Sequence, residues 1–189
     1  MESLKYSTTI RLWLRFALAM CVGLALAPGG GAQATMPDEY HVRAAIIVNL
    51  TKFVVWPPSK TADPHAPFVV GLLGYDEQSD AVERAFTGRL VDGRPVAVRR
   101  IGHSDRMDDC FLVYVALPEQ KHYDEVAPEL TRAGVLTVSD DERFVFNGGV
   151  VGLPVTGDHI QIQINLAHAQ SSGLAISSRL LQLATVVGR

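Results

Sequence analysis

Short apolar runs separated by helical patterns constrain the fold of this chain more than any other feature of its sequence. Phe68–Leu73 and Phe111–Leu117 are nearly continuous apolar runs, a pattern typical of strands buried on both faces of a mainly parallel sheet. Gly134–Ser139 is expected as a further strand, and Pro95–Arg100 as a strand with one exposed side. Because parallel strands need long crossover connections, this spacing predicts an α/β fold in a Rossmann-like arrangement.

Helices are expected before and between these strands. The acidic start at Pro37-Asp38-Glu39 and the apolar period that follows it predict a first helix over about Asp38–Val54, ended by Trp56-Pro57-Pro58. Asp80–Phe86 and Pro118–Thr131 are the expected crossover helices. All of these elements fit within one domain.

The last third of the chain has a different pattern. Arg143–Asn147, Val150–Pro154 and His159–Leu166 are successive strand-like segments without room for helices between them, which predicts a C-terminal β-ribbon or antiparallel edge. Leu174–Val187 has apolar residues on one helical face and predicts a closing helix. An exposed ribbon edge also makes a homodimer a hypothesis.

The amino-terminal segment has the pattern of an export signal. Lys5, Arg11 and Arg15 precede the apolar run Phe16–Ala27, and Ala32-Gln33-Ala34 forms a small-x-small cleavage site. We therefore expect residues 1–34 to be a cleavable signal peptide and residues 35–189 to be the exported, periplasmic domain. A retained membrane anchor is the alternative, but the run is shorter than the roughly 20 residues that span a bilayer.

The composition of the expected mature domain limits its partners. Removing the three basic and one acidic residues of the leader leaves fourteen basic and nineteen acidic residues, a net charge near −5, which does not favour nucleic acid. Cys110 is then the one remaining cysteine, so no internal disulfide can form. We expect this free thiol to be a small buried hydrophobic group, with intermolecular pairing or redox sensing as the alternatives.

No local motif indicates catalysis, a metal or a cofactor. Gly71-Leu72-Leu73-Gly74 lacks both phosphate-loop patterns, the histidines lack metal-ligand spacing, and Ser139 lacks a nucleophile frame. We expect a non-enzymatic protein. The alternative is a small-ligand binder that uses the carboxyl ends of the strands, near Gly71, Gly74, Ser139 and Asp140.

Several segments together resemble the YfiR-like family of periplasmic proteins. The opening Tyr-His-Val-Arg-Ala-Ala and the later Lys-Phe-Val-Val-Trp-Pro resemble the start of that family, and the remaining segments follow in the same order. The segments that carry the resemblance are Tyr40–Ala45, Asn49–Pro57, Pro67–Gly74, Gly93–Val96, Leu136–Asp140, Gly148-Gly149, Ile164–Leu166 and Gly173–Ala184.

The resemblance implies a periplasmic, non-catalytic regulator with a Rossmann-like fold. The best-known member restrains a membrane-bound diguanylate cyclase by binding its periplasmic sensor region, and release of that restraint raises cyclic di-GMP. That member carries disulfides, which this chain does not share. A chain of this kind acts through its surface, so we expect Val145 and Leu153 of the ribbon, and Trp56, to contact the partner, with Gly148-Gly149 setting the ribbon's turn. Completion of the core is the alternative role for each of them.

Overall fold

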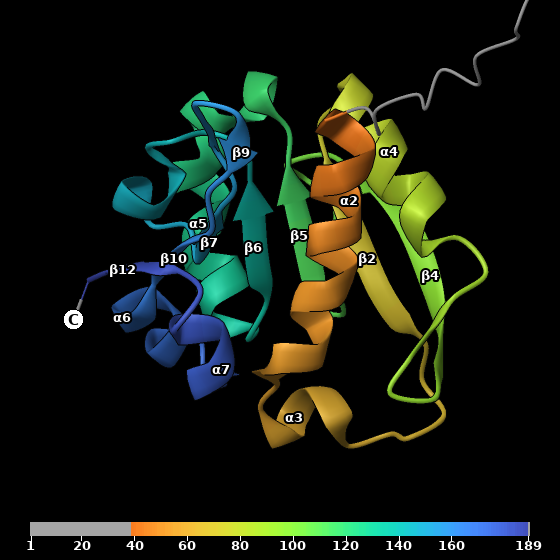
Figure 1. The fold of residues 1–189 in the computed structure, drawn as a ribbon. Coiled ribbons are helices and arrows are strands. Elements are labelled where there is room, and N and C mark those ends of the chain that lie inside the picture. Colours follow the sequence, from red (N-terminus) through yellow and green to blue (C-terminus); the bar gives the residue numbers. More distant parts are fainter. Residues whose placement is uncertain (1–38, 189) are drawn as a thin grey trace, which may run out of the picture. The chain divides into compact units, whose positions relative to one another are not determined.

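The computed structural model describes residues 39–188, a domain with helices on both faces of a β-sheet (Figure 1). The expected leader lies outside the described residues. The helices are α2 (Glu39–Leu50), α3 (Pro58–Thr61), α4 (Glu77–Phe86), α5 (Tyr123–Arg132), α6 (Leu166–Ser171) and α7 (Ser178–Leu181), with 3₁₀ turns η1 (Thr51–Phe53), η2 (Leu117–His122) and η3 (Phe144–Asn147). The strands are β1 (Val54–Val55), β2 (Phe68–Leu73), β3 (Leu90–Val91), β4 (Arg94–Ile101), β5 (Leu112–Val115), β6 (Leu136–Ser139), β7 (Val151–Gly152), β8 (Val155–Thr156), β9 (His159–Ile160), β10 (Gln163–Asn165), β11 (Ala175–Ile176) and β12 (Thr185–Val187).

The main sheet is parallel at its centre. Its order within residues 39–188 is β12-β10-β7-β6-β5-β2-β4-β3, and β2 pairs in parallel with both β4 and β5. β6 continues the parallel pairing from β5, and β7 continues it from β6. The chain order reverses at β2, so the topological switch point lies between β2 and β5. The expected α/β fold with a mainly parallel sheet is confirmed.

Each face of the sheet has its own apolar core. α2 and α4 lie side by side on one face, and α5 covers the other (Figure 1). Because successive side chains of a strand point to opposite faces, Leu112 and Tyr114 of β5 pack into the first core, whereas Val113 and Val115 pack into the second. This two-sided burial is the physical reason for the continuous apolar runs in the sequence.

Helix α4 begins earlier than expected because its first turn is capped by side chains. Asp76 accepts a hydrogen bond from the Ser79 amide at 2.7 Å, and Ser79 Oγ accepts one from the Asp76 amide at 2.9 Å, which forms a capping box. The other Asp76 oxygen accepts a hydrogen bond from the Leu117 amide at 3.2 Å. Asp76 therefore joins the loop after β2 to the loop after β5.

The prediction of a strand over Arg143–Asn147 is wrong, because this segment is the 3₁₀ turn η3. Phe144 and Val145 are adjacent in sequence and both fully buried, which a strand with one wet face does not allow. Gly148 ends the turn at φ +93°, so the glycine pair closes η3 and does not form a ribbon turn. The observed ribbon is the short hairpin β8–β9.

The prediction of one closing helix over Leu174–Val187 is also wrong. The segment divides into β11, which pairs with β1, the four-residue α7, and β12, which pairs in parallel with β10. Leu183, which would lie on the apolar face of such a helix, is 71% exposed. The expected helix Pro118–Thr131 likewise begins as the 3₁₀ turn η2 and becomes α-helical only from Tyr123.

Candidate functional site

A buried arginine near the start of α2 contacts residues of α2, of α4, of the segment before β8 and of the loop after β6. The Arg43 side chain is 3% exposed, and its Nε donates to the Leu153 carbonyl at 3.1 Å. One terminal nitrogen donates to Gln78 Oε1 of α4 at 2.8 Å, and the other donates to Glu39 one helical turn earlier at 2.6 Å. Because a buried guanidinium is costly unless its donors are satisfied, this network fixes α2 against α4 and against the segment that leads into the β8–β9 hairpin.

Asp140, directly after β6, completes the charged cluster. Its Oδ2 lies 3.6 Å from an Arg43 terminal nitrogen, and its Oδ1 is buried without a hydrogen-bond partner among the described residues. Burial raises the pKa of Asp140 above its ordinary value, and the positive charge of Arg43 opposes this shift. The carboxylate is thus held by an imperfect ion pair with Arg43 and by an interaction with the Tyr114 hydroxyl.

The Tyr114 hydroxyl lies in the same buried region. It interacts with the Asp140 carboxylate but makes no well-aligned hydrogen bond among the described residues. Burial raises the pKa of Tyr114, and the negative charges of Asp140 and Asp76 raise it further. The cluster therefore contains two buried polar groups whose hydrogen bonding is incomplete.

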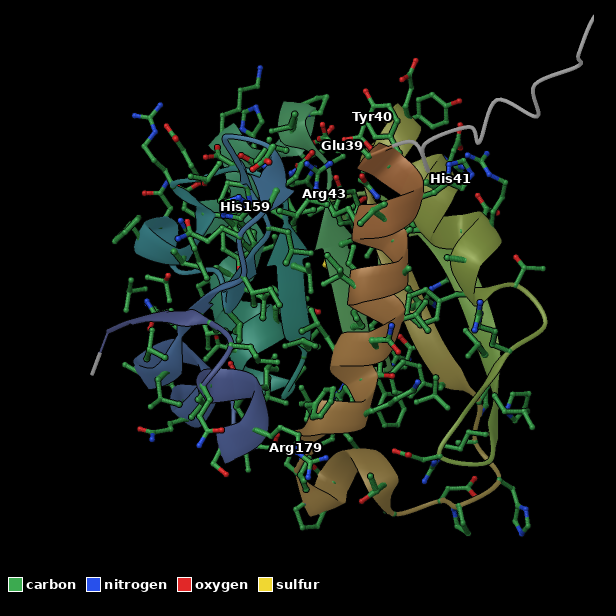
Figure 2. All side chains as sticks on the ribbon, viewed as in Figure 1. Glu39, Tyr40, His41, Arg43, His159 and Arg179 are labelled. Carbon is green, nitrogen blue, oxygen red and sulfur yellow. The ribbon has the colours of Figure 1, made fainter. Side chains whose placement is uncertain are left out.

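A surface groove runs between α2 and the β8–β9 hairpin, next to this cluster. Its volume is about 500 Å³, and its apolar lining comes from Val42 and Ile46 of α2 and from Val155 and Ile160 of the hairpin. The remaining lining residues are Glu39, Gly157, Asp158 and His159. Figure 2 shows Glu39 and Arg43 on the side of α2 that faces His159 and the hairpin.

The groove and the arginine network share residues. Glu39 lines the groove and also accepts the Arg43 hydrogen bond. The Leu153 carbonyl, which Arg43 also holds, lies two residues before the hairpin strand β8. Both walls of the groove are therefore fixed to one buried side chain, and we call this groove the α2–hairpin groove.

The ribbon residues expected to contact a partner are not at the surface. Val145 and Leu153 are both fully buried, so the expectation that they are exposed is wrong. Val145 lies in η3, where its carbonyl accepts a hydrogen bond from Asn165 at 2.8 Å. Leu153 contributes its side chain to the core under α2 and its carbonyl to Arg43.

Trp56 caps the core beside the end of α2. It is 6% exposed, and its indole nitrogen donates to the Phe111 carbonyl at 2.8 Å. Its ring packs edge-on against Phe68 and Phe111, with ring centroids 5.2 and 5.8 Å away. These contacts occupy the ring and its polar atom in the manner of a core residue.

The residues suggested for a ligand crevice do not form one cavity. Gly71 lies within β2, where an added Cβ would be 2.7 Å from the Ile101 side chain. Gly74 has φ +84° and lies against the Glu119 side chain. Ser139 is fully buried and donates to the Val115 carbonyl at 2.6 Å, while Gln120 donates to its hydroxyl. Of this set, Asp140 alone belongs to the Arg43 cluster.

The carboxyl ends of the central strands are covered by the chain itself. The 3₁₀ turn η2 places Glu119 over Gly74 and Gln120 against Ser139. The place where doubly wound sheets usually bind ligands is thus occupied by η2 side chains. The α2–hairpin groove lies apart from these strand ends.

Cys110 is a free cysteine, and the expectation that it is buried is confirmed. Burial raises the pKa of its thiol, although Arg99 Nη2 lies 3.5 Å from the sulfur and opposes the shift. Lys60 donates to the Cys110 carbonyl at 2.6 Å. The thiol is therefore held in its protonated, weakly nucleophilic form.

Within residues 39–188, no group of three or more His, Cys, Asp or Glu side chains is placed to hold a metal ion. No helix in the same range is long and apolar enough to cross a membrane. The sequence did not single out the α2–hairpin groove. Its one local sign was an acid followed four residues later by an arginine, Glu39 and Arg43, at the start of an otherwise apolar helix.

The domain shares its mainly parallel α/β fold with several solved structures. One is a conserved domain protein from Vibrio cholerae, with a TM-score of 0.55 and 10% identity. Another is an ABC domain from Streptococcus pneumonia solved in complex with L-Trp, with a TM-score of 0.52 and 13% identity. Each match covers 78% of this chain and 60% of the solved chain, so this protein spans about three fifths of their length. These identities establish the fold alone.

Family membership is more specific. The model of the YfiR/HmsC-like family, DUF4154, matches residues 40–185, so this chain belongs to that family. The resemblance inferred from the sequence is confirmed. The family is a regulatory, non-catalytic one. No curated protein sequence matches this chain.

Proposed function

We propose that this protein is exported to the periplasm by its leader and restrains a membrane-bound diguanylate cyclase by binding the periplasmic sensor region of that enzyme. Family membership supports the regulatory class. The observation that carries the proposal is the α2–hairpin groove, whose apolar walls remain partly open to solvent. Val42 is 38% exposed and Val155 is 45% exposed, and apolar surface of this kind, gathered beside polar residues, marks interaction sites.

The groove is suited to inhibition because it is already in place before a partner arrives. Arg43 holds α2 and the start of the hairpin together through hydrogen bonds of 2.6 to 3.1 Å. A rigid surface loses little conformational freedom on binding, so more of the contact energy remains as affinity. Such a surface restrains an enzyme when it binds the inactive conformation of the sensor more tightly than the active one.

Capture of the cyclase tests the role of the groove. Val155→Asp places a charge on the groove wall at a partly exposed position, and Val55→Asp makes the same change on β1, where Val55 is 67% exposed and outside the groove. Tagged protein is used to isolate complexes from solubilised membranes, and co-purified diguanylate cyclase is identified and its activity measured.

We expect wild type and Val55→Asp to retain the cyclase. Val155→Asp should capture about tenfold less cyclase, or still less, because burying an unpaired charge is costly. Circular dichroism and thermal unfolding confirm that both variants are folded. Equal capture by the two variants would show that the groove does not bind the sensor.

A small-ligand-binding role is the second candidate. A solved relative of the fold was crystallised with L-Trp, and the groove's volume of about 500 Å³ is within the usual range for small-molecule sites. Gly71, Gly74, Ser139 and Asp140 would belong to such a role only if η2 moved away from the strand ends. Thermal unfolding with L-Trp and other amino acids tests this role, because a ligand that binds the folded state raises the melting temperature as its concentration increases.

A further inference from the structure

We infer that the α2–hairpin groove receives a basic amphipathic helix of the partner protein. This inference deepens the proposed function and rests on it, since it gives the chemistry of the segment that the sensor region would present. Three features of the described residues support it: the charge around the groove, the spacing of its apolar residues and the fixed position of one of its carboxylates.

The charges around the groove are mainly negative. Glu39 and Asp158 line it, and their side chains are half and fully exposed. No lysine or arginine is among its lining residues. Arg43 lies nearby, but it is buried and directed to Glu39, Gln78 and Leu153. A partner that brings lysine or arginine to the groove rim is therefore attracted, and a partner with acidic residues there is repelled.

The apolar residues are spaced for a helix. Val42 and Ile46 are one turn apart on α2 and form one wall, and Val155 and Ile160 form the facing wall on the hairpin. A partner helix with apolar residues at i, i+3 or i+4, and i+7 would place them between these walls, as in other helix-in-groove complexes. Basic residues flanking that apolar stripe would then meet Glu39 and Asp158.

The Glu39 carboxylate is held in position before any partner binds. Arg43 donates to its Oε1 at 2.6 Å. A fixed carboxylate loses less side-chain entropy on forming a new ion pair than a mobile surface carboxylate does. The second rim carboxylate, Asp158, is fully exposed and lies 3.3 Å from the Nδ1 atom of His159, which also lines the groove.

Synthetic peptides test the partner chemistry directly with the full-length protein. The first is a helix-forming peptide of about 18 residues with leucines on one face and lysines on the other, long enough to span several turns. The second replaces each lysine by glutamate, and the third has the lysine peptide's composition in scrambled order. Binding is measured by fluorescence anisotropy at low and high salt.

The paired variant is Glu39→Gln with Asp158→Asn, which removes both rim charges while keeping side-chain size. Its matched control is Asp124→Asn with Glu125→Gln on α5, where both residues are exposed and belong to a helix on the opposite face of the sheet. The control removes the same net charge. A general effect of protein charge would therefore weaken binding equally in both.

We expect the lysine peptide to bind wild type and the control, and to bind the rim variant about tenfold more weakly, with a further loss at high salt. The glutamate and scrambled peptides should bind at least about tenfold more weakly than the lysine peptide. Failure of the lysine peptide to bind, equal binding of the glutamate peptide, or equal loss in the rim variant and the control would overturn the inference.

Two other occupants give distinct results. If the groove binds a small ligand, that ligand raises the melting temperature of the protein and all three peptides fail to bind. If it binds a second copy of this chain, the protein forms a concentration-dependent dimer that Val155→Asp dissociates. Either result overturns the basic helix. The proposed function fails separately, when Val155→Asp and Val55→Asp capture the cyclase equally.

Discussion

At the scale of single residues, the Arg43 cluster is the most demanding feature of the domain. One guanidinium serves three acceptors and faces a second carboxylate, Asp140, that is 3.6 Å away. Buried charges of this kind are tolerated because each compensates another. Removing one member therefore costs more than the loss of a single surface ion pair.

Replacement of Arg43 by alanine should strongly destabilise the domain. The change leaves Asp140, Glu39, the Gln78 carbonyl oxygen and a buried main-chain carbonyl without their donor, so we expect a loss of about 3 to 5 kcal/mol in the free energy of unfolding. Arg179→Ala removes the same type of side chain from an exposed position on α7 and should change stability by about 0.5 kcal/mol or less. Urea unfolding of both variants measures the difference; equal stability would show that the buried network contributes nothing.

Asp140 should make stability depend on pH in an unusual direction. Its folded-state pKa is raised above the ordinary 3.8, so the folded state holds this proton more tightly than the unfolded state does. The stability that this protonation provides is present below pH 3.8 and is lost as the pH rises from there through the folded-state pKa. The unfolding free energy of wild type relative to Asp140→Asn should therefore fall across that window, and a constant difference would contradict the raised pKa.

Two buried tyrosines provide a matched pair for the cost of an unmade hydrogen bond. The Tyr123 hydroxyl bonds to Thr137 Oγ1 at 3.1 Å and to the Gly148 carbonyl at 3.3 Å, whereas the Tyr114 hydroxyl makes no well-aligned hydrogen bond among the described residues and only approaches Asp140. Tyr123→Phe should lose about 1 kcal/mol, while Tyr114→Phe should lose less, because the poorly aligned contact of its hydroxyl with Asp140 compensates little of its desolvation. Thermal unfolding compares them, and a larger loss for Tyr114→Phe would contradict this assignment.

At the scale of elements, the turn η2 determines where open space is found. It covers the carboxyl ends of β2, β5 and β6 through Glu119 and Gln120. The proposed binding groove consequently lies between α2 and the β8–β9 hairpin, and not at the switch point of the sheet. The fold class alone would predict a binding site at the switch point of the sheet.

Two glycines separate the effect of this packing from that of backbone conformation. Gly74 has φ +84° and lies against Glu119, whereas Gly88 has φ +72° and nothing within 4 Å of an added Cβ. Gly88→Ala should cost about 1 kcal/mol for the left-handed backbone alone. Gly74→Ala should cost about 1 to 3 kcal/mol more because η2 must shift. Equal costs in chemical unfolding would show that η2 does not press on β2.

The sequence allowed prediction of the elements that are decided locally or by two-sided burial. β2 and β5 were predicted because continuous apolar runs are required inside a parallel sheet. β4 was predicted as a strand with one exposed side and β6 as a further strand of the same sheet. η3 and the C-terminal segment were mispredicted, because Phe144 and Val145 are buried by distant parts of the chain, and because β12 is a strand only through its pairing with β10. Strand propensity depends on such tertiary context.

The site was harder to predict than the fold for the same reason. Asp140 was predicted to lie in a ligand crevice because it follows a strand end. Its contact with Arg43 instead depends on how α2 crosses the sheet. The two groove walls are more than a hundred residues apart in sequence, and neither carries a motif. Cys110, by contrast, was placed correctly because burial follows from its apolar neighbours alone.

At the scale of the whole molecule, family membership, the expected export signal and the α2–hairpin groove together define the proposed role. The family assignment covers residues 40–185, the leader is the proposed route to the periplasm, and the α2–hairpin groove is the proposed contact with the sensor region. Of these, the proposed groove contact is the part that would link the structure to signalling. Regulation by a rigid surface requires only differential affinity for two sensor conformations.

Cellular cyclic di-GMP, measured in strains that carry wild type, Val155→Asp or Val55→Asp at equal protein levels, tests that link most directly. The account predicts that Val155→Asp raises cyclic di-GMP to the level of a strain lacking the protein, because the cyclase is no longer restrained, and that Val55→Asp stays at the wild-type level. Unchanged cyclic di-GMP in the Val155→Asp strain, with the variant folded, would contradict it.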